Sequence, residues 1–197
     1  MITDDRGALL QRGLRLEYAT LGWNVVEIGF LVVAAIAARS VALAGFALDS
    51  FIEIFASLVV VRELRGETDN PKAVRLIGVA FLLLAIYVSL QTVVTLVAGV
   101  RPDDSPLGIA WLAATTVVMF GLAAGKARVG RAANHALLQA EAKVTMVDGA
   151  LAAAILLGLV LNAAVGWWWA DLAAGMVLVA YGVKEGREHL RANDAPN

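Results

Sequence analysis

The sequence predicts an all-α membrane protein with six transmembrane helices and both termini in the cytoplasm. Its composition is the first reason: of the 197 residues, 60% are hydrophobic and 17% are charged, and the mean hydropathy is +0.75. A soluble domain of this size usually carries about 25% charged residues. The other two reasons are the number of long apolar runs and the uneven distribution of lysine and arginine.

A helix needs about 20 apolar residues to cross a bilayer. The chain has six such runs, at about 16–38, 40–64, 73–99, 107–126, 142–165 and 168–184. The four prolines lie between these runs or in the tail, where a missing N–H group breaks no helix: Pro71, Pro102, Pro106 and Pro196. We therefore predict a cytoplasmic lead-in over 1–15, one transmembrane domain over 16–187 and a short cytoplasmic tail over 188–197.

Lysine and arginine are concentrated on one side of this predicted topology. All but two of the 16 basic residues fall on the side of the two termini, and Arg39 and Arg101 are the exceptions. Because cytoplasmic loops collect positive charge, both termini are expected inside the cell and the protein in the cell (inner) membrane. The first residues are polar and lack the apolar core of a removable signal peptide.

Other classes of protein find little support in the sequence. With a pI of about 6.1 and no basic stripe interleaved with aromatics, no nucleic-acid partner is expected. The absence of cysteine excludes disulfides and thiolate ligands. No enzymatic activity and no resident cofactor are expected, because no histidine or cysteine lies inside a predicted span as a nucleophile or base.

The second predicted span carries two acids near its middle. Asp49 and Glu53 are four residues apart, so their side chains lie one above the other on one helix face. A carboxylate at that depth costs roughly 3 kcal/mol on insertion scales, and two adjacent like charges cost more. The pair therefore predicts a cation site.

Further polar groups lie at nearly the same predicted depth. Asn24 and Glu27 share a face of the first span, and Asp148 lies in the fifth span, where Glu141 and Thr145 continue its polar stripe. No basic residue is expected at comparable depth. Asn24 as interhelical glue and Glu27 as a protonated acid are the structural alternatives, and membership of Glu141 or Thr145 in the site stays open.

These residues resemble the membrane domain of the cation diffusion facilitator (cation efflux) family. The resemblance covers about 16–187 and rests on the small-residue run that leads into Asp49, Ser50 and Glu53, on Asp148 in the fifth span, and on Asn24 with Glu27 as a first-span addition. Two short segments at the ends of the sixth span add to it: Trp169-Ala170-Asp171 and Lys184-Glu185-Gly186.

The resemblance implies a homodimer that exports a divalent transition metal, most often Zn²⁺, in exchange for protons. Its metal ligands are then Asp49, Glu53 and Asp148, completed by Glu27 and Asn24. Two departures are visible. Val144 stands where the family commonly has a histidine, and the chain ends soon after the sixth span, as in a subgroup without the cytoplasmic C-terminal domain.

The chemistry of the residues supports exchange independently of the resemblance. Clustered carboxylates at bilayer depth cannot all stay ionised when empty, so protons and a metal ion compete for the same oxygens. An all-oxygen set also suits Mn²⁺ or Fe²⁺. Those metals, a proton-coupled exporter of another small cation, a membrane metalloenzyme and a non-transporting binding protein are the alternatives.

Overall fold

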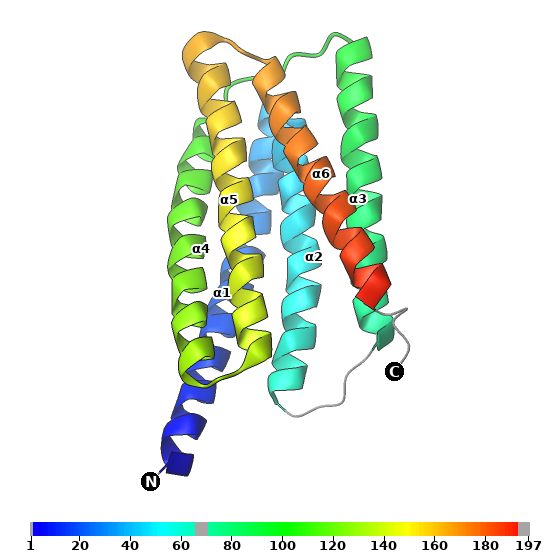
Figure 1. Cartoon of the computed structure of the whole chain (residues 1–197). Coiled ribbons are helices and arrows are strands. Elements are labelled where there is room, and N and C mark those ends of the chain that lie inside the picture. Colours follow the sequence, from blue (N-terminus) through cyan, green and yellow to red (C-terminus); the bar gives the residue numbers. More distant parts are fainter. Residues whose placement is uncertain (1, 66–70, 193–197) are drawn as a thin grey trace.

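The computed structural model describes residues 2–65 and 71–192, which form six α-helices and no strands (Figure 1). The helices, in chain order, are α1 Ile2–Ala38, α2 Val41–Leu64, α3 Pro71–Val97, α4 Pro106–Ala132, α5 Ala136–Val165 and α6 Trp169–Ala192. The predicted all-α, six-helix fold is confirmed. Residues 66–70, between the second and third helices, and residues 193–197 of the predicted tail lie outside the described part.

Five of the six helices are long and apolar enough to cross a membrane: α1 to α5. In α6 the uncharged run is limited to 172–183, because Asp171, Lys184 and Glu185 interrupt it. This helix lies alongside α3, and Gly182 and Gly186 allow a close approach, since a Cβ on either would come within 2.9 Å of a backbone oxygen of α3. The chain is therefore an integral, multi-pass membrane protein.

The helices pack as a bundle whose core is mainly apolar, with buried polar side chains set among the hydrophobic ones. α1 packs against α2 and α4, α4 packs against α5, and α3 and α6 form a pair that meets the rest through α2 and α5. α2 and α5 come close to one another at few points. The beginning of α1 and the end of α6 lie at one end of the bundle, which is called the terminal end here, and the opposite end is called the far end (Figure 1).

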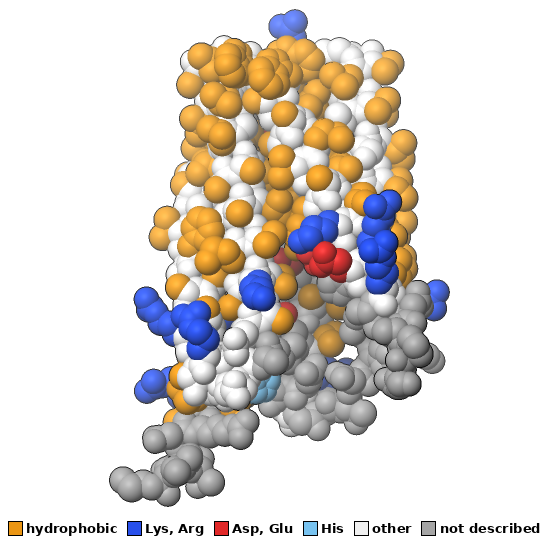
Figure 2. All heavy atoms as spheres, viewed as in Figure 1, with side chains coloured by type: hydrophobic (Ala, Val, Ile, Leu, Met, Phe, Trp, Pro, Cys, Tyr) orange, Lys and Arg blue, Asp and Glu red, His pale blue; other side chains and the backbone are white. Residues whose placement is uncertain are grey.

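The surface divides into an apolar band and a charged end. Figure 2 shows hydrophobic side chains over the half nearer the far end, whereas acidic and basic side chains gather toward the terminal end. Arg39, in the turn between α1 and α2, is at the far end and pairs with Asp103 at 2.6 Å. This distribution is the one on which the prediction of cytoplasmic termini rests.

Caps hold the helix ends at the far end. Ser105 accepts a hydrogen bond from the Gly108 N–H at 3.2 Å and precedes Pro106, the first residue of α4. Asp171 lies in the first turn of α6 but caps a different helix. Its buried carboxylate accepts hydrogen bonds from the Ser40 hydroxyl and from the Val41 N–H at 3.1 Å, so it caps α2 from α6.

Several helices extend past the predicted spans at the terminal end. α1 begins at Ile2, so the predicted lead-in is itself helical. α4 continues to Ala132 and α5 begins at Ala136, with His135 as its N-cap. Lys126, the predicted last residue of the fourth span, therefore lies well inside α4 and about 9 Å along the axis from its end.

Candidate metal site

The site begins with the two acids of α2. Asp49 is fully buried and Glu53 is 6% exposed, so both face the interior of the bundle rather than lipid. Glu53 lies about 17 Å from either end of α2, at the middle of the span. The side chains of α2 are the most extensively buried among the five apolar helices, which explains why polar residues on it meet protein.

Asp148 of α5 joins these two acids from the opposite side of the interior. One carboxylate oxygen from each of Asp49, Glu53 and Asp148 lies within 4.8 Å of the others. Within the described chain, both oxygens of each aspartate and Oε1 of Glu53 are buried without a hydrogen-bond partner. Three acids so close repel one another unless a cation or protons lie between them. We call these three residues the carboxylate group.

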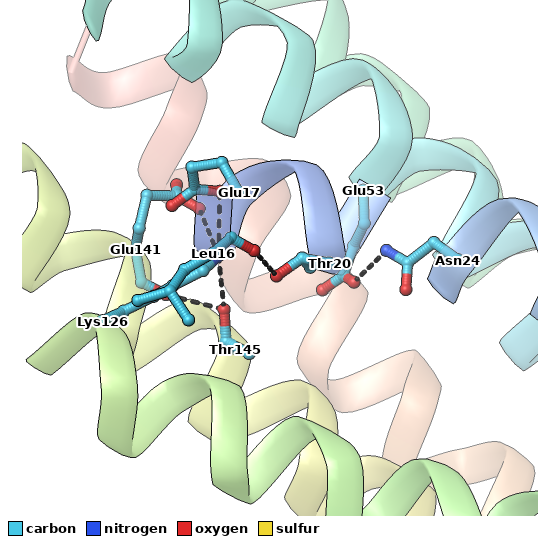
Figure 3. Close-up of polar contacts among 8 residues, drawn as sticks. All are labelled: Leu16, Glu17, Thr20, Asn24, Glu53, Lys126, Glu141 and Thr145. Carbon is cyan, nitrogen blue, oxygen red and sulfur yellow. Dashed lines mark hydrogen bonds and ion pairs between the residues drawn. The ribbon is translucent and has the colours of Figure 1, made fainter. Parts of the chain in front are cut away.

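Asn24 of α1 is attached to this group. Its side-chain Nδ2 donates a hydrogen bond to Glu53 Oε2 at 3.1 Å (Figure 3). Its carbonyl oxygen, Oδ1, is buried and has no partner among the described residues. The amide therefore orients the Glu53 carboxylate and still has one oxygen available to a cation.

Glu27 lies beside the carboxylate group but not in it. Its carboxylate accepts hydrogen bonds from Ser50 at 3.2 Å, from the Trp111 indole N–H at 3.2 Å and from the Thr115 hydroxyl. Both of its oxygens are thus occupied, and it is absent from the set whose oxygens converge. The structure brings together the other four predicted ligands and turns Glu27 toward α4.

The sequence did not indicate that α4 supplies hydrogen-bond donors to Glu27. Thr115 donates to Glu27, whereas its neighbour Thr116 donates to the backbone carbonyl of Leu112 at 2.7 Å. Trp111, which was not considered, is held between Trp23 and Phe30 by stacking at 5.2 and 4.1 Å. The sequence does hold one indication of this contact, because Trp111 and Thr115 are one turn apart and therefore share a face of α4.

The expectation that no basic residue lies inside the bundle is wrong. Lys126 is fully buried, and its ammonium nitrogen lies 2.9 Å from Glu17 Oε2 and 3.8 Å from Glu141 Oε2. It also donates to the Thr145 hydroxyl at 3.1 Å. The error came from ending the fourth span at this lysine, which placed its charge in water.

Among the described residues, Lys126 contacts Glu17, Glu141 and Thr145 and none of the three acids of the carboxylate group. Glu141 and Asp148 are seven residues apart on α5, which is about 10 Å along the helix axis. Glu141 and Thr145, whose membership of the site was open, contact the lysine rather than the three acids. The interior thus holds two separate acidic regions.

Comparison with protein families identifies the membrane domain. The model of the cation efflux transmembrane domain matches residues 74–193, more than half of the chain and nearly all of α3 to α6. Asp148 lies within the match, whereas α1 and α2 precede it. A search of curated proteins found no match to the chain. Together with the membrane-spanning bundle, the family match shows that the chain belongs to the cation efflux family, a family of membrane transporters that export cations.

Proposed function

We propose that this transporter exports a divalent transition metal ion, with Zn²⁺ as the first candidate, in exchange for protons. The observation that carries the proposal is the convergence of Asp49, Glu53 and Asp148 at mid-span, with oxygens that no described donor satisfies. A dication between them would replace repulsion by attraction. Protons would do the same when the metal leaves, so the two compete.

Asp49, Glu53 and Asp148 are the proposed primary ligands. Asn24 adds an amide oxygen next to Glu53, since its Oδ1 is free while its Nδ2 is bonded. Glu27 completes the site mainly through its charge, because its oxygens already accept three hydrogen bonds. It becomes a ligand only if a helix movement releases it from Thr115 and Trp111.

The same geometry suggests how the site could be exposed to the two membrane faces in turn. The ligands come from α1, α2 and α5, so a small rocking of these helices around the mid-span group would open it to either face in turn. We further propose that the termini are cytoplasmic, in the inner membrane, and that two copies of the chain associate as a homodimer. Neither nucleic acid nor a resident cofactor takes part in this mechanism.

Metal identity rests on the donors. All the proposed ligand atoms are oxygen, which makes the site harder than a zinc site containing histidine. Mn²⁺ or Fe²⁺ at the same site is therefore the alternative that the structure favours most. An exporter that uses the acids for protons alone, with another small cation as substrate, is the next alternative.

Metal flux into sealed vesicles tests the proposal. Purified protein is reconstituted, and uptake of Zn²⁺, Mn²⁺ and Fe²⁺ is measured with and without a pH gradient. Antiport is supported if metal flux follows the metal gradient and becomes faster when the compartment that the metal enters is made acidic. Flux that ignores the pH gradient would replace antiport by facilitated diffusion, and no flux of any divalent ion would reject the proposed function.

A further inference from the structure

A buried polar track joins the carboxylate group to the terminal end of the bundle. It runs along one face of α1 and one face of α5, with side chains three or four residues apart. Its members are Glu17, Thr20 and Asn24 on α1 and Glu141, Thr145 and Asp148 on α5. All are buried except Glu141, whose side chain is 14% exposed. Figure 3 shows Thr20 between the Glu17 end of this track and Glu53.

The track offers hydrogen-bond acceptors and almost no donors. Thr20 donates its hydroxyl hydrogen to the Leu16 carbonyl at 3.0 Å, and Thr145 donates to the Glu141 carbonyl at 3.0 Å. Their hydroxyl oxygens therefore keep only lone pairs for the interior. The carboxylates and the unpartnered Asn24 Oδ1 are acceptors as well. Such a lining is suited to a cation.

One cation is already present on this track. Lys126 is the only basic side chain buried among the residues whose burial is described, and it reaches Glu17, Glu141 and Thr145 (Figure 3). α4 comes close enough to α1 because Gly125 has no side chain. A Cβ there would lie 3.2 Å from Leu16 Cδ2.

The lysine leaves this region with spare acceptor capacity. Two carboxylates face one ammonium, which leaves one negative charge unbalanced when both acids are ionised. Glu17 Oε1 is buried without a partner among the described residues, although Oε2 of the same group is only 2.9 Å from Lys126. A divalent ion would satisfy both carboxylates, but it would repel an ammonium at this distance.

We propose that Glu17 and Glu141 form a second cation position, which Lys126 occupies at rest and which the transported metal ion takes in passing. The ion and the ammonium exclude one another, so the metal displaces Lys126 from Glu17 when it moves between the terminal end and the carboxylate group. A lysine suits this exchange because its charge is on a flexible four-carbon stem that can withdraw. The inference extends the proposed function, since it requires a divalent ion on the track.

The direct test counts bound metal in full-length protein purified in detergent. The carboxylate group is first disabled by Asp49→Asn, Glu53→Gln and Asp148→Asn together, so that any bound ion must be elsewhere. Equilibrium dialysis with Mn²⁺ is then compared before and after addition of Lys126→Met. We expect one additional Mn²⁺ per chain after Lys126→Met, and its loss when Glu17→Gln is also introduced.

The disabled background separates this inference from the proposed function. Failure of the wild type to transport metal, with Mn²⁺ still gained on Lys126→Met, would reject the proposed function and keep the second position. A folded Lys126→Met protein that gains no Mn²⁺ overturns the second position. If Lys126→Met folds only when Mn²⁺ is present, the metal has replaced the ammonium and the inference is supported.

A second variant keeps Lys126 in place and so avoids an unpaired buried charge. In the otherwise native chain, Glu141→Gln should raise the KM for Mn²⁺ offered at the terminal end about tenfold, with no change in KM for the other face. Equilibrium binding at the carboxylate group should not change. Glu188→Gln, the same substitution at a side chain 59% exposed on α6, is the matched control. An unchanged KM for Glu141→Gln would also overturn the proposal.

Discussion

The two acidic regions in the bundle differ in how their charge is balanced. The region at the terminal end has Glu17 and Glu141 around a buried lysine, Lys126, whose nitrogen lies 2.9 Å from Glu17. The carboxylate group at mid-span has three acids within 4.8 Å and no basic side chain among the described residues in contact with it. Similar side chains, about 10 Å apart along α5, thus meet opposite electrostatic conditions.

This difference indicates which region is built to exchange its cation with solvent. At the terminal end, Lys126 balances one of the two acids, so only one negative charge there is left without a counter-ion in the fold. Acids without such a partner are stable in a membrane only with protons or a metal ion between them. In the proposed mechanism, the carboxylate group is the site whose occupancy changes during transport, and in the Lys126 region a side chain takes the place of the ion at rest.

The largest effect is expected from removing one acid of the unbalanced region. Asp49→Ala should reduce metal flux in vesicles to that of protein-free vesicles, because two carboxylates and an amide no longer enclose the ion. Insertion and yield should remain normal. Asp103→Ala, which removes an exposed acid paired with Arg39 at the far end, is the matched control. Normal flux from a well-expressed Asp49→Ala protein would contradict the assignment of this site.

Neutralising an acid should change stability in opposite directions in the two regions. Glu17→Gln replaces the charge-assisted hydrogen bond of Lys126 but leaves Glu141 as its counter-ion, so it should lower the free energy of unfolding by about 2 kcal/mol. Asp148→Asn removes a repelling charge and adds an amide donor for the remaining acids, so it should raise stability by about 1 kcal/mol.

Thermal unfolding in detergent with a metal chelator measures both changes. The triple variant Glu17→Gln, Glu141→Gln and Lys126→Met removes all three charges and should recover most of the stability lost by Glu17→Gln alone. If Asp148→Asn lost as much stability as Glu17→Gln, the carboxylate group would have to be balanced by a partner of its own.

The sequence was sufficient for most of the fold and for the burial of the acids that converge in the candidate site. Six apolar runs gave six helices, and acids four residues apart on α2 were placed correctly on a buried face opposite Asp148. These features depend only on helical periodicity and on the cost of charge in a bilayer. Both are local properties that can be read from a single chain.

The errors concern partners on other helices. Lys126 was placed in water because hydropathy marks where a span becomes polar, whereas α4 continues to Ala132. The sequence did not indicate that Asp171, in the first turn of α6, caps α2. Nor did it indicate that Glu27 accepts hydrogen bonds from α4. Which helix a polar residue faces depends on packing angles, and these do not follow from the periodicity of one segment.

Acid should oppose metal binding at the unbalanced region. Protons occupy the oxygen lone pairs that the metal needs, so affinity should fall as the pH falls, by about tenfold per pH unit for each proton displaced. Calorimetry in buffers of different ionisation enthalpy counts the protons released on metal binding. Asp49→Asn should lower that count, whereas Lys184→Met, an exposed change on α6, should not. A count of zero between roughly pH 6 and 8 would be incompatible with antiport.

The smallest expected effect concerns Val144, which lies on α5 between the two regions. It is three residues after Glu141 and four before Asp148, and its side chain is half-buried. Val144→His would place an imidazole one turn from Asp148. If this residue faces the carboxylate group, the nitrogen ligand should shift competition between Zn²⁺ and Mn²⁺ toward Zn²⁺, by about tenfold.

The same substitution also tests where the boundary between the regions lies. If the imidazole lies near Lys126 instead, it would compete with the ammonium for Glu141. The Zn²⁺/Mn²⁺ competition ratio would then stay unchanged, whereas the KM for Mn²⁺ offered at the terminal end would change. Met146→His, at an exposed position two residues further on and on the opposite face of α5, is the control and should leave both quantities unaltered. A shift in the metal ratio alone would mean that the carboxylate group extends one turn toward the terminal end. A shift in KM alone would assign this turn of α5 to the lysine region.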